Sequence, residues 1–327
     1  MDGHAGGATS RRLRQDLVPY VVARLEQAHR GGAPASEQVD ESIRRAFVEL
    51  DDEICTKSLE RVRAGAGAAG AAAVDPLRPA LSGSCGLLAF FDSSSKLLKV
   101  ACTGDSRAVL CRRGAGGAWG PIALSADQTG SCRAEVERLR REHPGEAATV
   151  VRNGRVLGNL EPTRAFGDAV YKWDAQTQQA VLPGRRVHPH LLTPPYVTAE
   201  PVVTTVSVRP ELGDFLVLAS DGLWERLSND QVAKLAGKWM DQRGGPASGS
   251  EDRNAATHLV RSALGGANHE ELSYLLSIPA GQSRSYRDDI TVTVVFFGVS
   301  QYQDQDIVVN GEASSWRRLE RTPRSRL

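Results

Sequence analysis

Four aspartates that lie far apart in the chain could do chemistry together. Each lies at a turn or at the end of an apolar run: Asp2, Asp105, Asp221 and Asp288. Carboxylates that lie close together repel one another unless cations lie among them. Donor sets made only of oxygen select hard cations such as Mg²⁺ or Mn²⁺. The chain has no thiolate or histidine cluster at the spacing that zinc requires.

Two such ions, about 3.5–4 Å apart, activate a bridging water and clamp the oxygens of an in-line phosphoryl displacement. These residue types therefore indicate a two-metal phosphohydrolase. Their spacing leaves open whether the substrate is a phosphoprotein, a nucleotide or a nucleic acid. The balanced charge of the chain, 40 basic against 39 acidic residues, argues against nucleic acid.

Asp221 ends an apolar stretch that is typical of a strand, Phe215-Leu-Val-Leu-Ala-Ser-Asp221. Phe215, Val217 and Ala219 share one parity with Asp221, and alternate residues of a strand face the same side. A strand that aims a carboxylate inward at its end either buries a charge at high cost or supplies a metal ligand. The alternative is an aspartate that caps the next element, and this stretch alone does not decide between them.

Asp288 precedes the last predicted strand, Ile290–Phe297, and shares parity with its apolar face. If this strand runs antiparallel beside Phe215–Asp221, the end of one strand meets the start of the other. Asp221 and Asp288 would then converge.

Asp2, the first of the four candidate aspartates, lies in the glycine-rich turn Asp2-Gly3-His4-Ala-Gly-Gly. Apolar residues at helical spacing follow it, so the turn begins a helix, where backbone N–H groups favour anions. The alternative is a flexible terminus with a capping aspartate. Asp105 lies in the tight turn Gly104-Asp105 between two predicted strands, and turn chemistry alone would explain an aspartate there.

Helical and strand-like patterns occur in the same chain, and antiparallel meanders are predicted, which indicates an α+β fold. We expect helices at 40–63, 132–142, 229–236, 255–264 and 270–276, strands at 85–91, 97–103, 107–112 and 202–208, and a hairpin at 150–157. Arg164 and Asp168 are expected to form a structural ion pair or a cap, with a functional pair as the alternative. The low-complexity segment 64–73 reads as a loop insertion, and 301–327 as a disordered tail.

Composition restricts the remaining possibilities. The chain has 327 residues, 41% of them hydrophobic, and a net charge of +1, which suits one large domain or two small ones. No apolar run approaches the roughly 20 residues of a membrane span. The cysteines are odd in number and form no C-x-x-C pair, so we expect reduced thiols in an intracellular compartment.

Five motifs, in this order, resemble those of the metal-dependent PP2C-type (PPM) serine/threonine protein phosphatases. They are Asp2-Gly-His-Ala-Gly, Gly104-Asp-Ser-Arg107, Arg164-Ala-Phe-Gly-Asp168, Ala219-Ser-Asp-Gly-Leu-Trp-Glu225 and Arg287-Asp-Asp-Ile-Thr291. Together they cover the chain from Asp2 to about Phe297. The segments Thr193–Pro201 and Tyr286–Ile290 look like the mitochondrial pyruvate dehydrogenase phosphatase branch, including its fungal relatives.

The resemblance implies an α/β/β/α sandwich of two antiparallel sheets flanked by helices, as a phosphatase domain over residues 1–300. It also implies two Mg²⁺ or Mn²⁺ ions, with a third that is held more weakly. Asp2 would bridge the first two ions, and the Gly3 carbonyl would bind the second. Asp221 and Asp288 would hold the first ion. Asp105 would bind the third ion together with Asp221.

His4 matches the family's proposed general acid, which protonates the leaving serine or threonine oxygen; alternatively, it holds a metal-bound water. Asp168 matches a motif residue that we interpret as structural. Asp289 would support the ligands. The implied reaction is attack of a metal-bridging water on a phosphomonoester, with phosphorylated pyruvate dehydrogenase as a candidate substrate. Neither nucleic acid nor a membrane span is expected.

The chain departs from the family pattern at its start. Family members have a strand before the Asp-Gly-His turn, which carries an acidic pair and a phosphate-gripping arginine, and here Met1 takes the place of the residue before Asp2. We expect a truncated gene model, which would also have lost any transit peptide. The resemblance implies the mitochondrial matrix, with the cytoplasm as the alternative. The alternative function is a truncated, inactive pseudophosphatase that binds phosphoproteins or regulates them.

Overall fold

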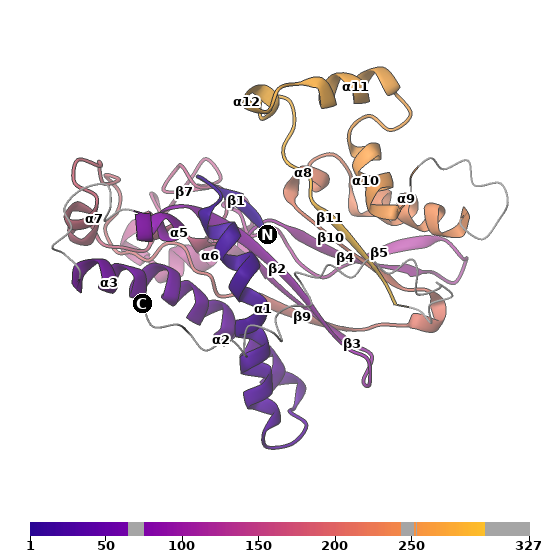
Figure 1. Ribbon diagram of the computed structural model, residues 1–327, viewed down its shortest axis with the longest axis horizontal. Helices are drawn as coiled ribbons and strands as arrows, with labels where there is room; N and C mark the ends of the chain where they lie inside the picture. The colour runs from indigo at the N-terminus through magenta and orange to yellow at the C-terminus, as the bar shows by residue number, and fades with distance from the viewer. Residues whose placement is uncertain (65–74, 243–251, 253, 298–327) are drawn as a thin grey trace, which may run out of the picture. The chain divides into compact units, whose positions relative to one another are not determined.

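A computed structural model describes residues 1–64, 75–242, 252 and 254–297 (Figure 1). Met1–Phe297 forms one compact unit. The tail 301–327 and nearly all of the low-complexity segment lie outside the described residues, so the expectations for them stay predictions. Of the helices in the described ranges, none combines the length and the apolar composition that a membrane-spanning segment needs.

Two antiparallel sheets form the centre of this unit. In the first sheet, β1 (Asp2–His4), β2 (Gly83–Asp92), β3 (Leu97–Thr103) and β9 (Val202–Ser207) lie side by side in this order, and β8 (Phe166–Gly167) also pairs with β2. In the second sheet the order is β11 (Val292–Phe296), β10 (Phe215–Ala219), β4 (Arg107–Arg113) and β5 (Trp119–Ala123). The predicted antiparallel pairing of the last strand with Phe215–Ala219 is confirmed.

The sheets pack face to face because their apolar faces share one buried cluster. Leu98 and Val100 of β3 lie in it together with Leu110 of β4 and Leu216 of β10. The alternation of apolar residues along each strand therefore serves two cores, one between the sheets and one under the helices on the outer face.

Helices cover the outer faces. On the first sheet lie α1 (Ala8–His29) and α2 (Ser36–Asp52), and the largest apolar cluster joins their buried side chains to Ala101 and Phe166. On the second sheet, α9 (Asn229–Gln242) and α10 (Ala255–Ala263) bury apolar residues against Val109, Phe215 and Val217 (Figure 1). The layers are thus helix, sheet, sheet and helix, and the expected α+β sandwich is confirmed.

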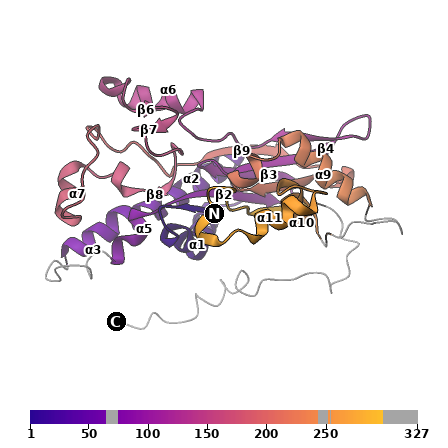
Figure 2. The same cartoon turned by 90° about the horizontal axis from the view of Figure 1, so that it is seen from above.

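The predicted helix over 40–63 is divided into three parts. After α2, a π-helical segment, Glu53–Lys57, leads into α3 (Ser58–Ala64). The predicted hairpin forms from β6 (Val151–Arg152) and β7 (Arg155–Val156), and with α6 (Arg133–Glu142) it lies outside both sheets (Figure 2). The remaining short elements are η2 (Asp75–Leu77), α5 (Arg78–Leu81), η3 (Pro144–Glu146), η4 (Ala169–Tyr171), α7 (Ala175–Val181), η5 (Pro210–Leu212), α8 (Asp221–Trp224), α11 (His269–Ser277) and α12 (Ala280–Ser283).

The expected pair between Arg164 and Asp168 is wrong. Arg164 instead binds Glu135 of α6, with Nη2 2.8 Å from Oε1, and Asp168 contacts His4. The reason is the backbone between them, which includes β8 and is not helical. Side chains four residues apart meet on a helix, whereas along a strand the same separation spans roughly 13 Å.

Candidate metal centre

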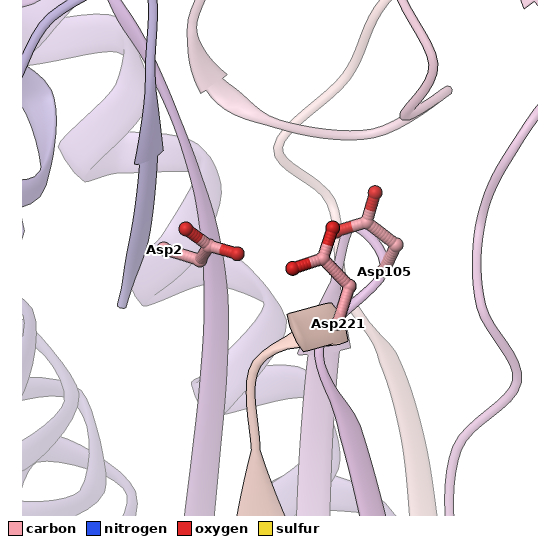
Figure 3. A group of neighbouring side chains, drawn as sticks. All are labelled: Asp2, Asp105 and Asp221. Carbon is pink, nitrogen blue, oxygen red and sulfur yellow. The ribbon is translucent and has the colours of Figure 1, made fainter. Parts of the chain in front are cut away.

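Three of the predicted ligands are brought together by two sheets. Asp2 lies in β1, Asp105 lies in the turn between β3 and β4, and Asp221 begins α8 directly after β10. One carboxylate oxygen of each residue lies within 4.8 Å of those of the other two. Figure 3 shows the carboxylate of Asp2 facing those of Asp105 and Asp221. Residues separated by more than 200 positions therefore form one acidic cluster.

A second acidic group shares Asp221 with the first. Oxygens of Asp221, Glu225 and Asp288 also lie within 4.8 Å of one another. The convergence of Asp221 and Asp288 follows from the pairing of β10 with β11, which sets Ala219 opposite Val292. Glu225 was not predicted as a site residue. The sequence could have indicated Glu225, because it lies four residues after Asp221, and side chains four apart on a helix are neighbours.

Gly222 is required for this close approach. A Cβ at this position would lie 2.6 Å from the carbonyl oxygen of Asp289 and 3.2 Å from the Cβ of Asp288. Asp289 supports the group through its backbone, since its N–H donates to Asp288 Oδ1 at 2.7 Å and its carbonyl accepts from Ser220 Oγ at 3.1 Å. Its side chain is exposed.

The electrostatics of the cluster favour a bound cation. Burial, together with the charges of Asp105 and Asp2, raises the pKa of Asp221 to about 7. Burial also raises the pKa of Asp105. Asp221 Oδ1 is buried and has no hydrogen-bond partner in the part of the chain that the structure describes, which costs about 1–3 kcal/mol for a polar group. A hard divalent cation would satisfy this oxygen and neutralise the repulsion, so these residues fit Mg²⁺ or Mn²⁺.

His4 forms a dyad with Asp168. The His4 Nε2 lies 2.5 Å from Asp168 Oδ2. Burial by itself lowers the pKa of His4, but the hydrogen bond and the charge of Asp168, with smaller contributions from Asp105 and Asp2, outweigh it, and the pKa is raised. Gly83 leaves room for the dyad, because a Cβ there would lie 2.0 Å from His4 Nε2. Asp168 was interpreted as structural; no pattern in the sequence indicates its contact with a residue 164 positions away.

The cluster opens into a pocket of about 660 Å³. Besides the aspartates, Gly3 and His4 line it, and so do residues of the β7 region and of the segment before β11, among them Arg155, Glu161, Arg284 and Arg287. Cys85 also lines it, and its thiol donates to Asp105 Oδ1 at 3.1 Å. Burial raises the pKa of the Cys85 thiol well above its usual range, so it stays protonated.

Comparisons with known proteins agree with this geometry. Residues 1–271 match the family described as "Protein phosphatase 2C". A protein phosphatase 2C homologue of Schizosaccharomyces pombe is 43% identical over 329 residues, which cover 90% of this chain and 72% of that protein. The mitochondrial [pyruvate dehydrogenase [acetyl-transferring]]-phosphatase 1 of Saccharomyces cerevisiae is 38% identical, over 96% of this chain and 65% of the yeast protein.

A solved structure shares the fold. The serine-threonine phosphatase 2C of Toxoplasma gondii superposes with a TM-score of 0.55 at 20% identity, over 90% of this chain and 82% of that one. The predicted resemblance to the pyruvate dehydrogenase phosphatases is confirmed by the identity with the yeast protein. The chain therefore belongs to the protein phosphatase 2C family of serine/threonine protein phosphatases.

Proposed function

We propose that this chain hydrolyses phosphoserine and phosphothreonine in proteins, with the acidic cluster as the centre of a metal-dependent reaction. The observation that carries the proposal is that two groups of carboxylates share Asp221, which lies at the pocket with Asp2, Asp105 and Asp288. Asp221 Oδ1 is buried and has no hydrogen-bond partner among the described residues. Two Mg²⁺ or Mn²⁺ ions, and a third held more weakly, match this donor set. When bound, such ions activate water and stabilise the charge on a transferring phosphoryl group.

The ligand roles that we propose are those that the family resemblance implies. Asp2 would bridge two ions, with the Gly3 carbonyl on the second ion. Asp221 and Asp288 would hold the first ion, and Asp105 would share a third with Asp221. The proximity of Glu225 to Asp221 and Asp288 adds a carboxylate that can accept hydrogen bonds from water on the first ion. Cys85 orients the Asp105 carboxylate through its thiol.

His4 would supply the proton that the leaving oxygen needs. It lines the same pocket, and Asp168 holds Nε2, which leaves Nδ1 as the ring nitrogen free to act in proton transfer. The raised pKa favours the imidazolium form, in which both ring nitrogens carry a proton. A serine or threonine alkoxide is a poor leaving group, so its protonation is worth about 10²–10⁴ in rate.

Phosphorylated pyruvate dehydrogenase is the proposed substrate, and mitochondria are the proposed location. The identity with the yeast mitochondrial pyruvate dehydrogenase phosphatase supports both. This chain spans 65% of that protein, so the activity of the whole relative is carried over only as a proposal. The alternative of an inactive binding module gains no support, because the four predicted carboxylates all gather at one pocket.

Release of phosphate from a phosphothreonine peptide tests the function directly. The chain, and a version extended upstream, should release phosphate with Mn²⁺ and lose the activity in EDTA. Asp221→Asn should abolish turnover, whereas Asp230→Asn, which removes an exposed carboxylate of α9, should not. If neither version turns over the peptide but both still bind it, the chain is a pseudophosphatase and the enzyme proposal is wrong.

A further inference from the structure

The proposed centre needs positive charge beyond its ions. Without the weakly held third ion, Asp2, Asp105, Asp221 and Asp288 contribute four negative charges, which the two tightly held divalent ions cancel. A bound phosphate monoester brings about −1.5 to −2 at neutral pH. This inference rests on the proposed function: if phosphate monoesters bind at this centre, a cationic side chain at the pocket should grip them. Arginine suits that task because its fork of N–H donors matches two phosphate oxygens at once.

Among the residues that the structure describes, Arg155, Arg284 and Arg287 line the pocket. Two of them are held by acceptors away from the acidic cluster. Arg155 donates to Glu161 Oε2 at 2.6 Å, and Arg287 Nε donates to the carbonyl oxygen of Leu275 at 3.3 Å. In the described part of the chain, neither of these two contacts involves a proposed metal ligand.

Arg284 differs because its partner is a proposed ligand. It directly follows α12, and its Nη1 donates to Asp288 Oδ1, four residues further on. The Arg284 side chain is 75% exposed, whereas that of Asp288 is 14% exposed. The guanidinium therefore neutralises Asp288 in the metal-free chain, from the solvent side of the pocket. Because the Arg284 side of the pair is exposed, solvent screens the attraction there, and a cation that binds Asp288 can replace the guanidinium.

We propose that Arg284 grips the phosphate group of the substrate, and that Asp288 holds it at the pocket until a divalent ion takes over that carboxylate. An ion on Asp288 would compete for the same oxygen and repel the guanidinium. Arg284 would then face the pocket with its donors unsatisfied and with no backbone movement required. Binding of the metal ion would thus free Arg284 to bind phosphate.

The test uses the full chain as wild type, Arg284→Ala, Arg284→Lys and a matched control, Arg226→Ala. Arg226 Nη2 donates to the carbonyl oxygen of Tyr286 at 2.7 Å, so it contacts the same segment without lining the pocket. Mn²⁺ affinity is measured from the electron paramagnetic resonance signal of free Mn²⁺. Binding of inorganic phosphate to the Mn²⁺-loaded proteins is measured by calorimetry, and KM is measured with a phosphothreonine peptide.

Arg284→Ala should bind phosphate about tenfold more weakly, as expected when one charge-assisted hydrogen-bonding partner is lost. Its KM should rise by a similar factor, and it should bind Mn²⁺ as tightly as wild type or a few-fold more tightly. Arg284→Lys should recover part of the phosphate affinity because it keeps the charge but loses the fork. Arg226→Ala should stay within about twofold of wild type in both affinities.

Three results would overturn the inference: unchanged phosphate affinity in Arg284→Ala, weakened Mn²⁺ affinity in the same variant, or an equal loss of phosphate affinity in Arg226→Ala. The second would make Arg284 a support for Asp288, and the third would ascribe the effect to a loosened segment. A wild-type chain that binds Mn²⁺ and phosphate without turnover would refute the proposed function alone, because both affinities still decide the role of Arg284. A chain that binds no Mn²⁺ would refute both.

Discussion

Replacing Asp221 by asparagine should stabilise the metal-free protein while it removes the metal-dependent activity. Burial and the charges of Asp105 and Asp2 raise the pKa of Asp221 from 3.8 to about 7. A carboxyl group whose pKa is raised by folding binds its proton more tightly in the folded than in the unfolded chain. Its ionised form therefore destabilises the fold at neutral pH. Asparagine keeps the shape of the side chain and removes the charge.

The size of the effect follows from the pKa. If fully expressed, the rise from 3.8 to about 7 corresponds to about 4 kcal/mol. Solvent reaches the open pocket and screens the charges, so we expect Asp221→Asn to raise the free energy of unfolding by about 2 kcal/mol at pH 7. The ionised carboxylate destabilises the fold fully at a pH above the pKa that Asp221 has in the folded chain. It has no effect at a pH below the pKa that Asp221 has in the unfolded chain. The advantage of the variant should therefore shrink as the pH falls from 7 and vanish near pH 4.

Urea unfolding in EDTA, followed by tryptophan fluorescence, measures this difference. Asp230→Asn, which removes an exposed carboxylate outside the cluster, is the control and should match wild type. Saturating Mn²⁺ should make wild type more stable than Asp221→Asn. An ion that binds only folded wild type adds about 2.7 kcal/mol to its free energy of unfolding at a concentration of a hundred times its Kd. If Asp221→Asn is no more stable than wild type in EDTA at pH 7, the carboxylates do not repel as described, and the cluster is not the compact site proposed above.

Three further predictions concern residues around the cluster. Asp168→Asn should lower kcat on a phosphothreonine peptide by about 100-fold but much less on p-nitrophenyl phosphate, whose leaving group needs little protonation; equal losses on both substrates would contradict the general-acid role. Burial by itself raises the pKa of Glu135, but its hydrogen bonds with Arg164 and Arg138 outweigh burial and lower the pKa to about 2. Glu135→Gln should therefore cost about 3 kcal/mol in urea unfolding at pH 7. This cost should decline as the pH falls below about 4.5 toward 2, and a constant cost would argue against the ion pair. In Gly222→Ala the added Cβ would lie 2.6 Å from the carbonyl oxygen of Asp289, so Mn²⁺ affinity, measured by electron paramagnetic resonance, should fall at least tenfold. Gly145 has open space around it, and Gly145→Ala should leave that affinity unchanged.

Local patterns in the sequence were sufficient to locate the donors of the candidate site. The two-residue period of a strand places Phe215 and Val217 in one buried cluster, as expected, whereas Asp221 begins the helix that follows the strand. The antiparallel pairing that was assumed for the last strand brings Asp288 to Asp221. The expectation for Arg164 was wrong because its partner, Glu135, lies in a helix 29 positions earlier, and no local pattern indicates that contact.

Contacts between distant segments had no such signal. The dyad of His4 with Asp168 joins residues 164 positions apart, and it exists because β1 and β8 both pair with β2. Neither pattern nor composition indicates this pair, because His4 lies in a very short strand and Asp168 directly follows another.

The sequence by itself determined the chemistry that is available: oxygen donors at the ends of apolar strands, and no cysteine or histidine cluster at the spacing of a zinc site. It did so because the local periodicity of a strand decides which side chains share a face. The tertiary structure alone decided which of these side chains meet, how deeply Asp221 is buried and which arginine stands beside the carboxylates. Those properties depend on how two sheets pack across the chain, and no short stretch of sequence contains that information.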